Sequence, residues 1–236
     1  MSKRFAFLVL EEHPYGREML ARLLEVGAAP ALMIEESSSV AEVERAKFQE
    51  RMQGFELAPG FEELLRGREL QRRVVASHNS EECQALLAAS QTSLLVLGGT
   101  GILKPRIFEY ARDGCLNAHP GLLPEVRGSA SVAWAIERDL PIGCTCHFID
   151  AAIDQGPIVS RQEIRVEPAD TYESLCWKTT RLSAKLMSAA VQAWIAGELR
   201  STPQPAGGET HRNMPEEGVL AVKRKLTEGR YLHQRS

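Results

Sequence analysis

The sequence has little of several features that define specialised classes of protein. No apolar run approaches the roughly 20 residues of a transmembrane helix. The run Phe5–Leu10 near the N-terminus is too short for a signal peptide. Five cysteines, odd in number and irregularly spaced, do not indicate a disulfide framework and fit a reducing cytoplasm. We therefore expect a cytoplasmic protein with no membrane partner.

The chain also has no large excess of charge of either sign. The chain has 28 Lys and Arg against 31 Asp and Glu, a formal net charge of -3. Without a basic field, nucleic acid is disfavoured as the main partner. A length of 236 residues with 44% apolar content fits one large domain, or one domain with a small appendage.

The N-terminal residues predict a βαβ unit. The apolar run Phe5–Leu10 is typical of a buried strand, and Arg17–Val26 has helical spacing that ends at Gly27. Pro30–Ile34 then predicts a second strand. A strand, a helix and a strand in this order indicate an α/β fold with a mainly parallel, twisted sheet.

The loop after the first strand lacks the glycine cluster with which dinucleotide-binding folds admit a phosphate. Glu11–Gly16 offers acids, a His and a Pro instead, so a dehydrogenase is disfavoured. His13 and Tyr15 are either exposed loop residues or contacts for another kind of substrate. Further on, Asn79 and Glu82 have the spacing of a capping box that opens the helix Glu81–Ala88.

The most informative stretch follows the short strand Gly114–Leu116. Asn117 and His119 lie two apart, so they point to the same side of an extended chain. Two prolines then stiffen the loop. Later in the chain, Asp154 stands just before a Gly-Pro break. An amide, an imidazole and an acid are thus expected near the ends of neighbouring strands.

Residues 117–124, Asn-Ala-His-Pro-Gly-Leu-Leu-Pro, followed by the Asp-Gln-Gly of residues 154–156, resemble the signature of folate-dependent formyltransferases. That family includes glycinamide ribonucleotide transformylase, methionyl-tRNA formyltransferase and the sugar N-formyltransferases. The resemblance runs from about Leu94 to Ile164, and before Ser90 it is one of layout only. It implies a Rossmann-like formyltransferase fold with helices on both faces of the sheet.

The resemblance implies transfer of a formyl group from 10-formyltetrahydrofolate to the primary amine of a small molecule. Asn117 and His119 would stabilise the tetrahedral oxyanion. Asp154 would assist proton transfer and raise the pKa of His119. His147 would support the acid from behind, and neither a metal nor a covalent nucleophile is required.

The resemblance also implies which residues bind the folate donor. By itself, the glycine-rich run Gly98–Gly101 is either a weak indication of a phosphate-binding loop or a tight turn. The family resemblance adds a third interpretation, in which this segment holds the pterin ring. The implied donor-binding residues are Thr100, Gly101, Ile102, Leu103, Leu122, Leu123, Pro124 and Asp150. Asp150 would cap its loop or hold the pterin through its backbone.

The sequence does not name the acceptor. Arg127-Gly128 followed by Trp134-Ala135-Ile136 resembles the tRNA and sugar branches, and Arg127 is a candidate acceptor contact with His13 and Tyr15. The glycine-poor first loop disfavours a phosphoribosyl acceptor. A nucleotide-linked amino sugar is favoured over an amino-acid, aminoacyl-tRNA or natural-product amine. A non-catalytic folate-binding relative is the alternative outside the enzymes, and a homodimer is considered as an assembly.

Two further predictions concern the rest of the chain. Cys144 and Cys146 share a face of the predicted strand Pro141–Ile149, and without a second pair of ligands at useful spacing they indicate core residues rather than a zinc site. Residues 1–200, with a long last helix up to Leu199, are expected to form the catalytic domain. Residues 201–236 would add a connector and a short helical tail.

Overall fold

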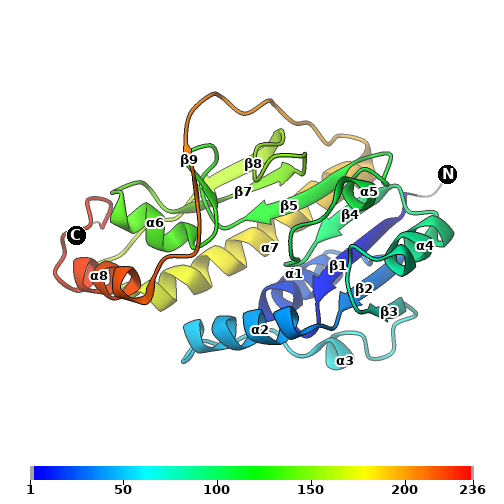
Figure 1. Cartoon of the computed structure of the whole chain (residues 1–236), viewed down its shortest axis with the longest axis horizontal. Coiled ribbons are helices and arrows are strands. Elements are labelled where there is room, and N and C mark those ends of the chain that lie inside the picture. The colour runs from blue at the N-terminus through cyan, green and yellow to red at the C-terminus, as the bar shows by residue number, and fades with distance from the viewer. Residues whose placement is uncertain (1–2, 235–236) are drawn as a thin grey trace.

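The structure is a computed structural model that describes residues 3–234. Its main sheet has seven strands in the order β3-β2-β1-β4-β5-β7-β8 (Figure 1). Neighbours from β3 to β5 pair in parallel, whereas β7 pairs antiparallel with both β5 and β8. The predicted mainly parallel, Rossmann-like α/β sheet is confirmed.

The strands are β1 (Phe5–Leu10), β2 (Leu32–Glu36), β3 (Gln71–Val75), β4 (Leu94–Leu97), β5 (Cys115–His119), β6 (Val126–Gly128), β7 (Gly143–Phe148), β8 (Ile158–Glu163) and β9 (Glu209–His211). The helices are α1 (Pro14–Glu25), α2 (Ser39–Arg51), α3 (Phe61–Leu64), α4 (Glu81–Ser90), α5 (Pro105–Phe108), α6 (Ser131–Glu137), α7 (Tyr172–Ala196) and α8 (Glu216–Thr227).

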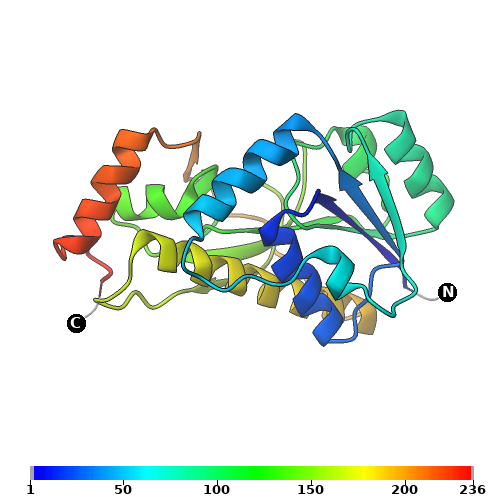
Figure 2. The ribbon, with the colours of Figure 1, turned by 90° about the horizontal axis from the view of Figure 1, so that it is seen from below.

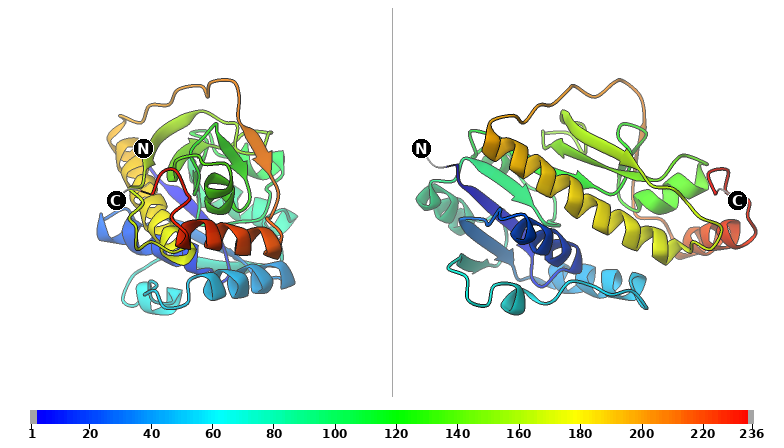
Figure 3. Two further views of the ribbon diagram at one scale, coloured as in Figure 1. Left: turned by 90° about the vertical axis from the view of Figure 1, so that its left-hand side faces the viewer. Right: turned by 180° about the vertical axis from the view of Figure 1, so that it is seen from behind.

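Helices cover both faces of the sheet. The long α7 lies across one face with α1 beside it, which is clear from below and from behind (Figures 2 and 3). On this side Phe7 of β1 packs in one core cluster with α1 and α7, while Leu8 packs in a second cluster with α4 and α5. Because alternate residues of β1 enter different cores, its sequence is apolar throughout.

Two helix starts differ from those predicted. Helix α1 begins at Pro14 rather than Arg17, since Pro14 occupies the first turn and the side chain of His13 accepts a hydrogen bond from the amide of Tyr15. The capping box at Asn79 is wrong by one residue. Ser80 caps α4 and accepts from the amide of Cys83 at 3.1 Å.

The interior of the α7 side contains the two cysteines of β7. Cys144 and Cys146 are fully buried, so the prediction of core residues is confirmed. All five cysteines are buried and reduced in the structure. No helix within residues 3–234 is both long and apolar enough to cross a membrane.

The segment after α7 turns back along the β8 edge of the main sheet. Thr202 pairs with Ile158 of β8, β9 pairs in parallel with β6, and α8 packs against α6 and α7. Figure 1 shows this segment, in orange, arching outside the β8 edge of the sheet before it reaches β9. We call residues 198–211 the connector. The division into a domain of residues 1–200 and a tail of residues 201–236 stays a prediction.

Gly16 is expected to be essential for the packing of α1 on the sheet. A Cβ at Gly16 would lie 2.2 Å from Cγ2 of Val9 and 2.5 Å from the carbonyl oxygen of Gly98, which is backbone and cannot rotate away. Gly16→Ala should lower the free energy of unfolding by about 1–3 kcal/mol in urea denaturation, although alanine favours a helix by about 1 kcal/mol.

Gly101→Ala is the matched control, because nothing lies within 4 Å of a Cβ built there. Its free energy of unfolding should stay within about 0.5 kcal/mol of the unsubstituted protein. Equal stability of the two variants would contradict the close approach of α1 to the Gly98 loop.

Candidate active site

The polar cluster begins with the antiparallel pairing of β5 and β7. Asn117 lies directly opposite His147, so the two side chains emerge on the same face, and Nδ2 of Asn117 lies 3.2 Å from Nε2 of His147. His119 follows two residues later on the same face. The strand spacing and the strand register therefore supply the amide and both imidazoles.

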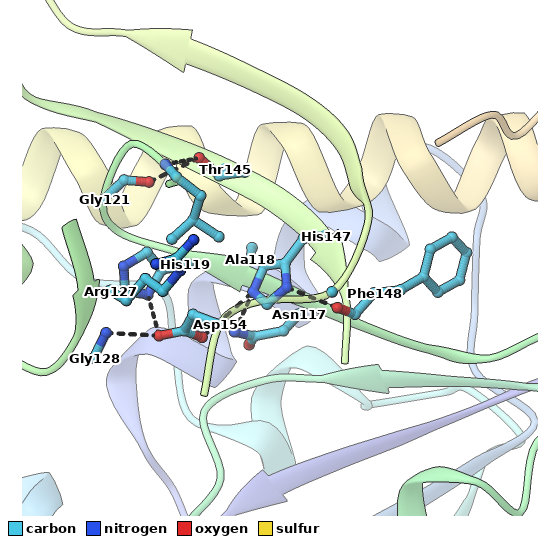
Figure 4. A network of polar contacts seen from close by, with 12 residues as sticks. Asn117, Ala118, His119, Gly121, Arg127, Gly128, Thr145, His147, Phe148 and Asp154 are labelled. Carbon is cyan, nitrogen blue, oxygen red and sulfur yellow. Dashed lines mark hydrogen bonds and ion pairs between the residues drawn. The ribbon is translucent and has the colours of Figure 1, made fainter. Parts of the chain in front are cut away.

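Asp154 completes the cluster from the loop between β7 and β8. Its backbone has a φ of 53°, and the turn before it is fixed by Asp150, whose Oδ1 accepts from the amide of Ala152 at 2.9 Å. Oδ2 of Asp154 accepts from the amide of Gly128 at 2.8 Å and lies 3.4 Å from Nδ1 of His119. Oδ1 lies 3.5 Å from Nε2 of His147, as the close-up in Figure 4 shows.

Backbone carbonyls fix the protons on the two imidazoles. A carbonyl oxygen only accepts, so Nδ1 of His147 donates to Phe148 at 2.8 Å and Nε2 of His119 donates to Val126 at 2.8 Å. In neutral His147, Nε2 then accepts from Asn117. One hydrogen of the Asn117 amide is thus engaged and the second is left for a ligand.

The ionisation of the cluster is set by Asp154. Burial by itself would raise the pKa of Asp154, but His119, His147 and the Gly128 amide outweigh it and lower the pKa to about 2. Burial also lowers the pKa of His119 below 6.5, and Asp154 opposes this without overcoming it. The expected net rise in the pKa of His119 is therefore wrong, because the ring is only 4% exposed.

The connector holds the Asp154 loop from outside. Nε2 of Gln204 donates to the carbonyl oxygens of Asp154 and Gly156, at 2.8 Å each. Arg127 donates in turn to Gln204 and to the carbonyl oxygen of Gly207. Arg127, a predicted acceptor contact, is thus buried and bonded to the connector, although its Nε has no partner among the described residues.

The two candidates of the first loop are buried, so the interpretation as exposed loop residues is wrong. His13 and Tyr15 are each 8% exposed. His13 packs edge-on against Phe48 with ring centroids 5.0 Å apart, and the Tyr15 hydroxyl donates to the carbonyl oxygen of Ala118, between Asn117 and His119. Tyr15 therefore lies directly behind the strand that carries the cluster.

The predicted donor-binding residues fall into two groups. Leu122, Leu123 and Pro124 are buried and can only shape the site from within. Thr100 and Gly101 are partly or fully open to solvent, and Ile102 is 80% exposed, whereas Leu103 is buried. Asp150 is exposed and its carboxylate caps the loop, as one of the two expectations for it stated.

Sequence reasoning missed three supporting residues. Asn79 brackets the Ile102 loop, donating to the carbonyl oxygen of Ile102 at 2.9 Å and accepting from the amide of Lys104 at 2.7 Å. Gln204 supports the Asp154 loop, and the Ser131 hydroxyl lies 3.2 Å from Nε2 of His119. Most of these contacts involve backbone atoms, so no side-chain motif in the sequence predicts them.

Residues 3–234 contain no group of three or more His, Cys, Asp or Glu side chains that could hold a metal ion.

An Asn-His-Asp cluster at the end of β5, on a twisted sheet with helices on both faces, defines an α/β protein of the Rossmann-like class with a polar site at the end of a strand. The sequence profile of the family described as "Formyl transferase" matches residues 3–191. The chain belongs to this family, and the match includes the N-terminal half, where the sequence resembled it in layout only.

Individual relatives fall into several branches of the family. The methionyl-tRNA formyltransferase of Aromatoleum aromaticum is 37% identical over 138 residues, which are 58% of this chain and 44% of that protein. The chain therefore spans less than half the length of this curated relative.

Solved structures share the fold at lower identity. The formyltransferase PseJ from Anoxybacillus kamchatkensis, in complex with UDP-4,6-dideoxy-4-formamido-L-AltNAc and tetrahydrofolate, has a TM-score of 0.60 at 20% identity and covers 92% of this chain and 90% of its own. The phosphoribosylglycinamide formyltransferase from Anaplasma phagocytophilum has a TM-score of 0.66 at 19% identity, with coverage of 91% and 100%.

Stability should fall in mild acid because burial lowers the pKa of His13, to about 4, and also that of His78 and His119. The unfolded chain binds protons near pH 6.5 while the folded protein does not. His13 should therefore remove about 1.4 kcal/mol of stability per pH unit between pH 6.5 and its folded-state pKa of about 4, and His78 and His119 should add to the loss in the same direction. Urea denaturation between pH 7 and pH 5 measures this slope.

His13→Asn is the matched variant, since Asn still caps α1 but does not titrate. Its slope should be smaller by about 1.4 kcal/mol per pH unit. An unchanged slope would show that His13 titrates normally in the folded protein.

Gln204→Ala should loosen the Asp154 loop without unfolding the protein, because it removes both hydrogen bonds from Gln204 to that loop. The amide of Gly128, held by Asp154, should exchange with deuterium about tenfold faster. The control is Gln192→Ala, an exposed residue whose amide reaches only the Val26 carbonyl oxygen at 3.5 Å. Equal exchange rates in the two variants would contradict this role of Gln204.

Proposed function

We propose that the protein transfers a formyl group from 10-formyltetrahydrofolate to the primary amine of a small molecule. The observation that carries this proposal is the convergence of Asn117, His119 and Asp154 in one bonded cluster. In the reaction the amine nitrogen forms a bond to the formyl carbon and the bond from that carbon to the folate nitrogen breaks. One proton leaves the amine and one is gained by the folate.

Asn117 is the group that stabilises the tetrahedral intermediate. Its side chain is half-buried, more open than His119 or His147, and one of its amide hydrogens has no acceptor in the cluster. An amide hydrogen held in a fixed direction by His147 stabilises a developing oxyanion without reorganising first. His147 is thus a positioning residue for Asn117.

His119 is a transient proton carrier. Its lowered pKa leaves the ring neutral near pH 7, so it can receive a proton as the amine attacks. Asp154 lies 3.4 Å from Nδ1 and stabilises the imidazolium while it exists. The proton then passes to the folate nitrogen, directly or through a water.

The formyl donor is expected to bind on the solvent-exposed side of the Asn117–His119–Asp154 cluster, at the end of β5. We assign the pterin to the Thr100–Leu103 segment, whose position Asn79 fixes, and to the backbone near Asp150. Leu122, Leu123 and Pro124 shape this edge from the interior. No metal ion enters the proposed reaction.

A nucleotide-linked amino sugar is the first candidate acceptor, in keeping with the sequence pattern Arg127-Gly128…Trp134-Ala135-Ile136. An aminoacyl-tRNA amine is the second candidate, because a methionyl-tRNA formyltransferase is the 37% identical relative. Incubation of the purified protein and 10-formyltetrahydrofolate with each acceptor in turn, with mass spectrometry to detect the formylated product, separates the two candidates.

Asn117→Ala should lower kcat for formyl transfer by about 10²–10³, the usual effect of removing an oxyanion donor, with little change in donor affinity. Asp154→Asn should likewise abolish transfer while calorimetry still detects binding of 5-formyltetrahydrofolate. Asn213→Ala, on an exposed loop before α8, is the control and should keep full activity. Absence of folate binding at millimolar ligand would overturn the donor assignment.

A further inference from the structure

A small cavity lies behind the catalytic strand, between the N-terminus of α1 and the helices α2, α6 and α7. Its volume is about 60 Å³. The residues that line it and matter here are Tyr15, Phe48, Arg51, Ser131, Tyr172 and Thr180. This volume accommodates about four water molecules, or one small acidic group.

The cavity adjoins the catalytic cluster on two sides. Ser131, one of its lining residues, has its hydroxyl 3.2 Å from Nε2 of His119. Pro120, another, directly follows His119 in the chain. The hydroxyl of Tyr15 is bonded to the strand carbonyl between Asn117 and His119. A molecule seated here would be separated from the His119 ring by the Ser131 hydroxyl alone.

Arg51 is the only fully charged side chain among the lining residues, and within residues 3–234 it has no ion-pair or hydrogen-bond partner. The other two arginines whose charge acts on nearby His13 have partners. Arg17 lies 4.0 Å from Glu12, and Arg45 donates to the carbonyl oxygen of Glu11. Arg51 makes no such contact anywhere in residues 3–234, although it is half-buried.

The surroundings of Arg51 are those of an anion site rather than of a solvated charge. Tyr15, Tyr172 and Thr180 are each at most 8% exposed, so the cavity wall is shielded from water. A guanidinium in such a wall interacts more strongly with an anion than one at the surface. The ring of Phe48 adds an apolar side that suits the carbon chain of a ligand.

We propose that this cavity binds the acidic group of the amine acceptor, so that the acceptor is a compact amine carrying a carboxylate or a phosphate paired with Arg51. The inference rests on the formyl-transfer function proposed above. Within that function it favours a compact acidic amine over the nucleotide-linked amino sugar and the aminoacyl-tRNA amine named there as candidates. The anion end enters the cavity, and the amine is left beside His119 and Asn117.

The test uses two matched pairs of amines, which are β-alanine with β-alaninamide and 3-aminopropyl phosphate with 3-aminopropanol. Binding of each is measured by calorimetry in the presence of 5-formyltetrahydrofolate. Formyl transfer to each gives kcat and KM. We expect the acidic member of at least one pair to bind at least about tenfold tighter than its neutral partner. The pair that shows the larger ratio distinguishes carboxylate from phosphate.

Arg51→Gln should abolish the preference by raising KM for the acidic amine about tenfold with little change in kcat. Arg51→Lys should keep part of it, since the charge remains but the planar fork is lost. Lys47→Gln removes the same charge from the exposed side of α2, where Lys47 pairs with Glu44, and should leave the preference intact. Circular dichroism confirms that each variant is folded.

Two results overturn the inference. One is equal affinity for both members of each pair, including no measurable binding of any of the four. The other is an unchanged preference in Arg51→Gln. Failure of the proposed function is recognised separately, because 5-formyltetrahydrofolate would then not bind and no amine would be formylated, whereas calorimetry with the four amines alone still reports on Arg51.

Discussion

An ionised carboxylate with little access to water is the constraint on which the site depends. The side chain of Asp154 is 12% exposed, and such a charge is costly unless it is paired and hydrogen-bonded. The amide of Gly128 donates a hydrogen bond to this carboxylate, and the two imidazoles lie 3.4 and 3.5 Å from it, where each pairs with it once the ring is protonated. The same contacts orient His119 and His147, and His147 orients Asn117. One buried charge thus fixes the geometry of the whole cluster.

Local pattern was enough to predict the elements that carry the site. Alternation along β5 placed Asn117 and His119 on one face, and the uniformly apolar β1 announced a sheet covered on both sides. The pairing of Asn117 with His147 depends on the register between β5 and β7, which no local pattern encodes. The supporting roles of Asn79 and Gln204 were also hidden, because both side chains bond to backbone atoms far away in sequence.

Burial explains the predictions that failed. The polar sequence around His13 suggested an exposed loop, but Pro14 starts α1 there and α2 covers the histidine through Phe48. The effect of Asp154 on His119 was expected to dominate, yet desolvation of the ring is larger. Desolvation of the His119 ring depends on every neighbour in space, whereas the sequence reveals only its charged partner, Asp154. That Arg51 has no partner among residues 3–234 is visible only in three dimensions for the same reason.

The central claim is that Asp154 stays ionised within the cluster throughout the pH range of a working enzyme. Carbon-13 NMR of the side-chain carboxyl groups, with the Asp154 signal assigned from Asp154→Asn, tests it directly. The account predicts a chemical shift typical of a carboxylate and no titration of that signal between pH 7 and pH 4.5, in line with a pKa of about 2. A titration within that range would mean that the carboxyl group is protonated at the site, and would contradict the account.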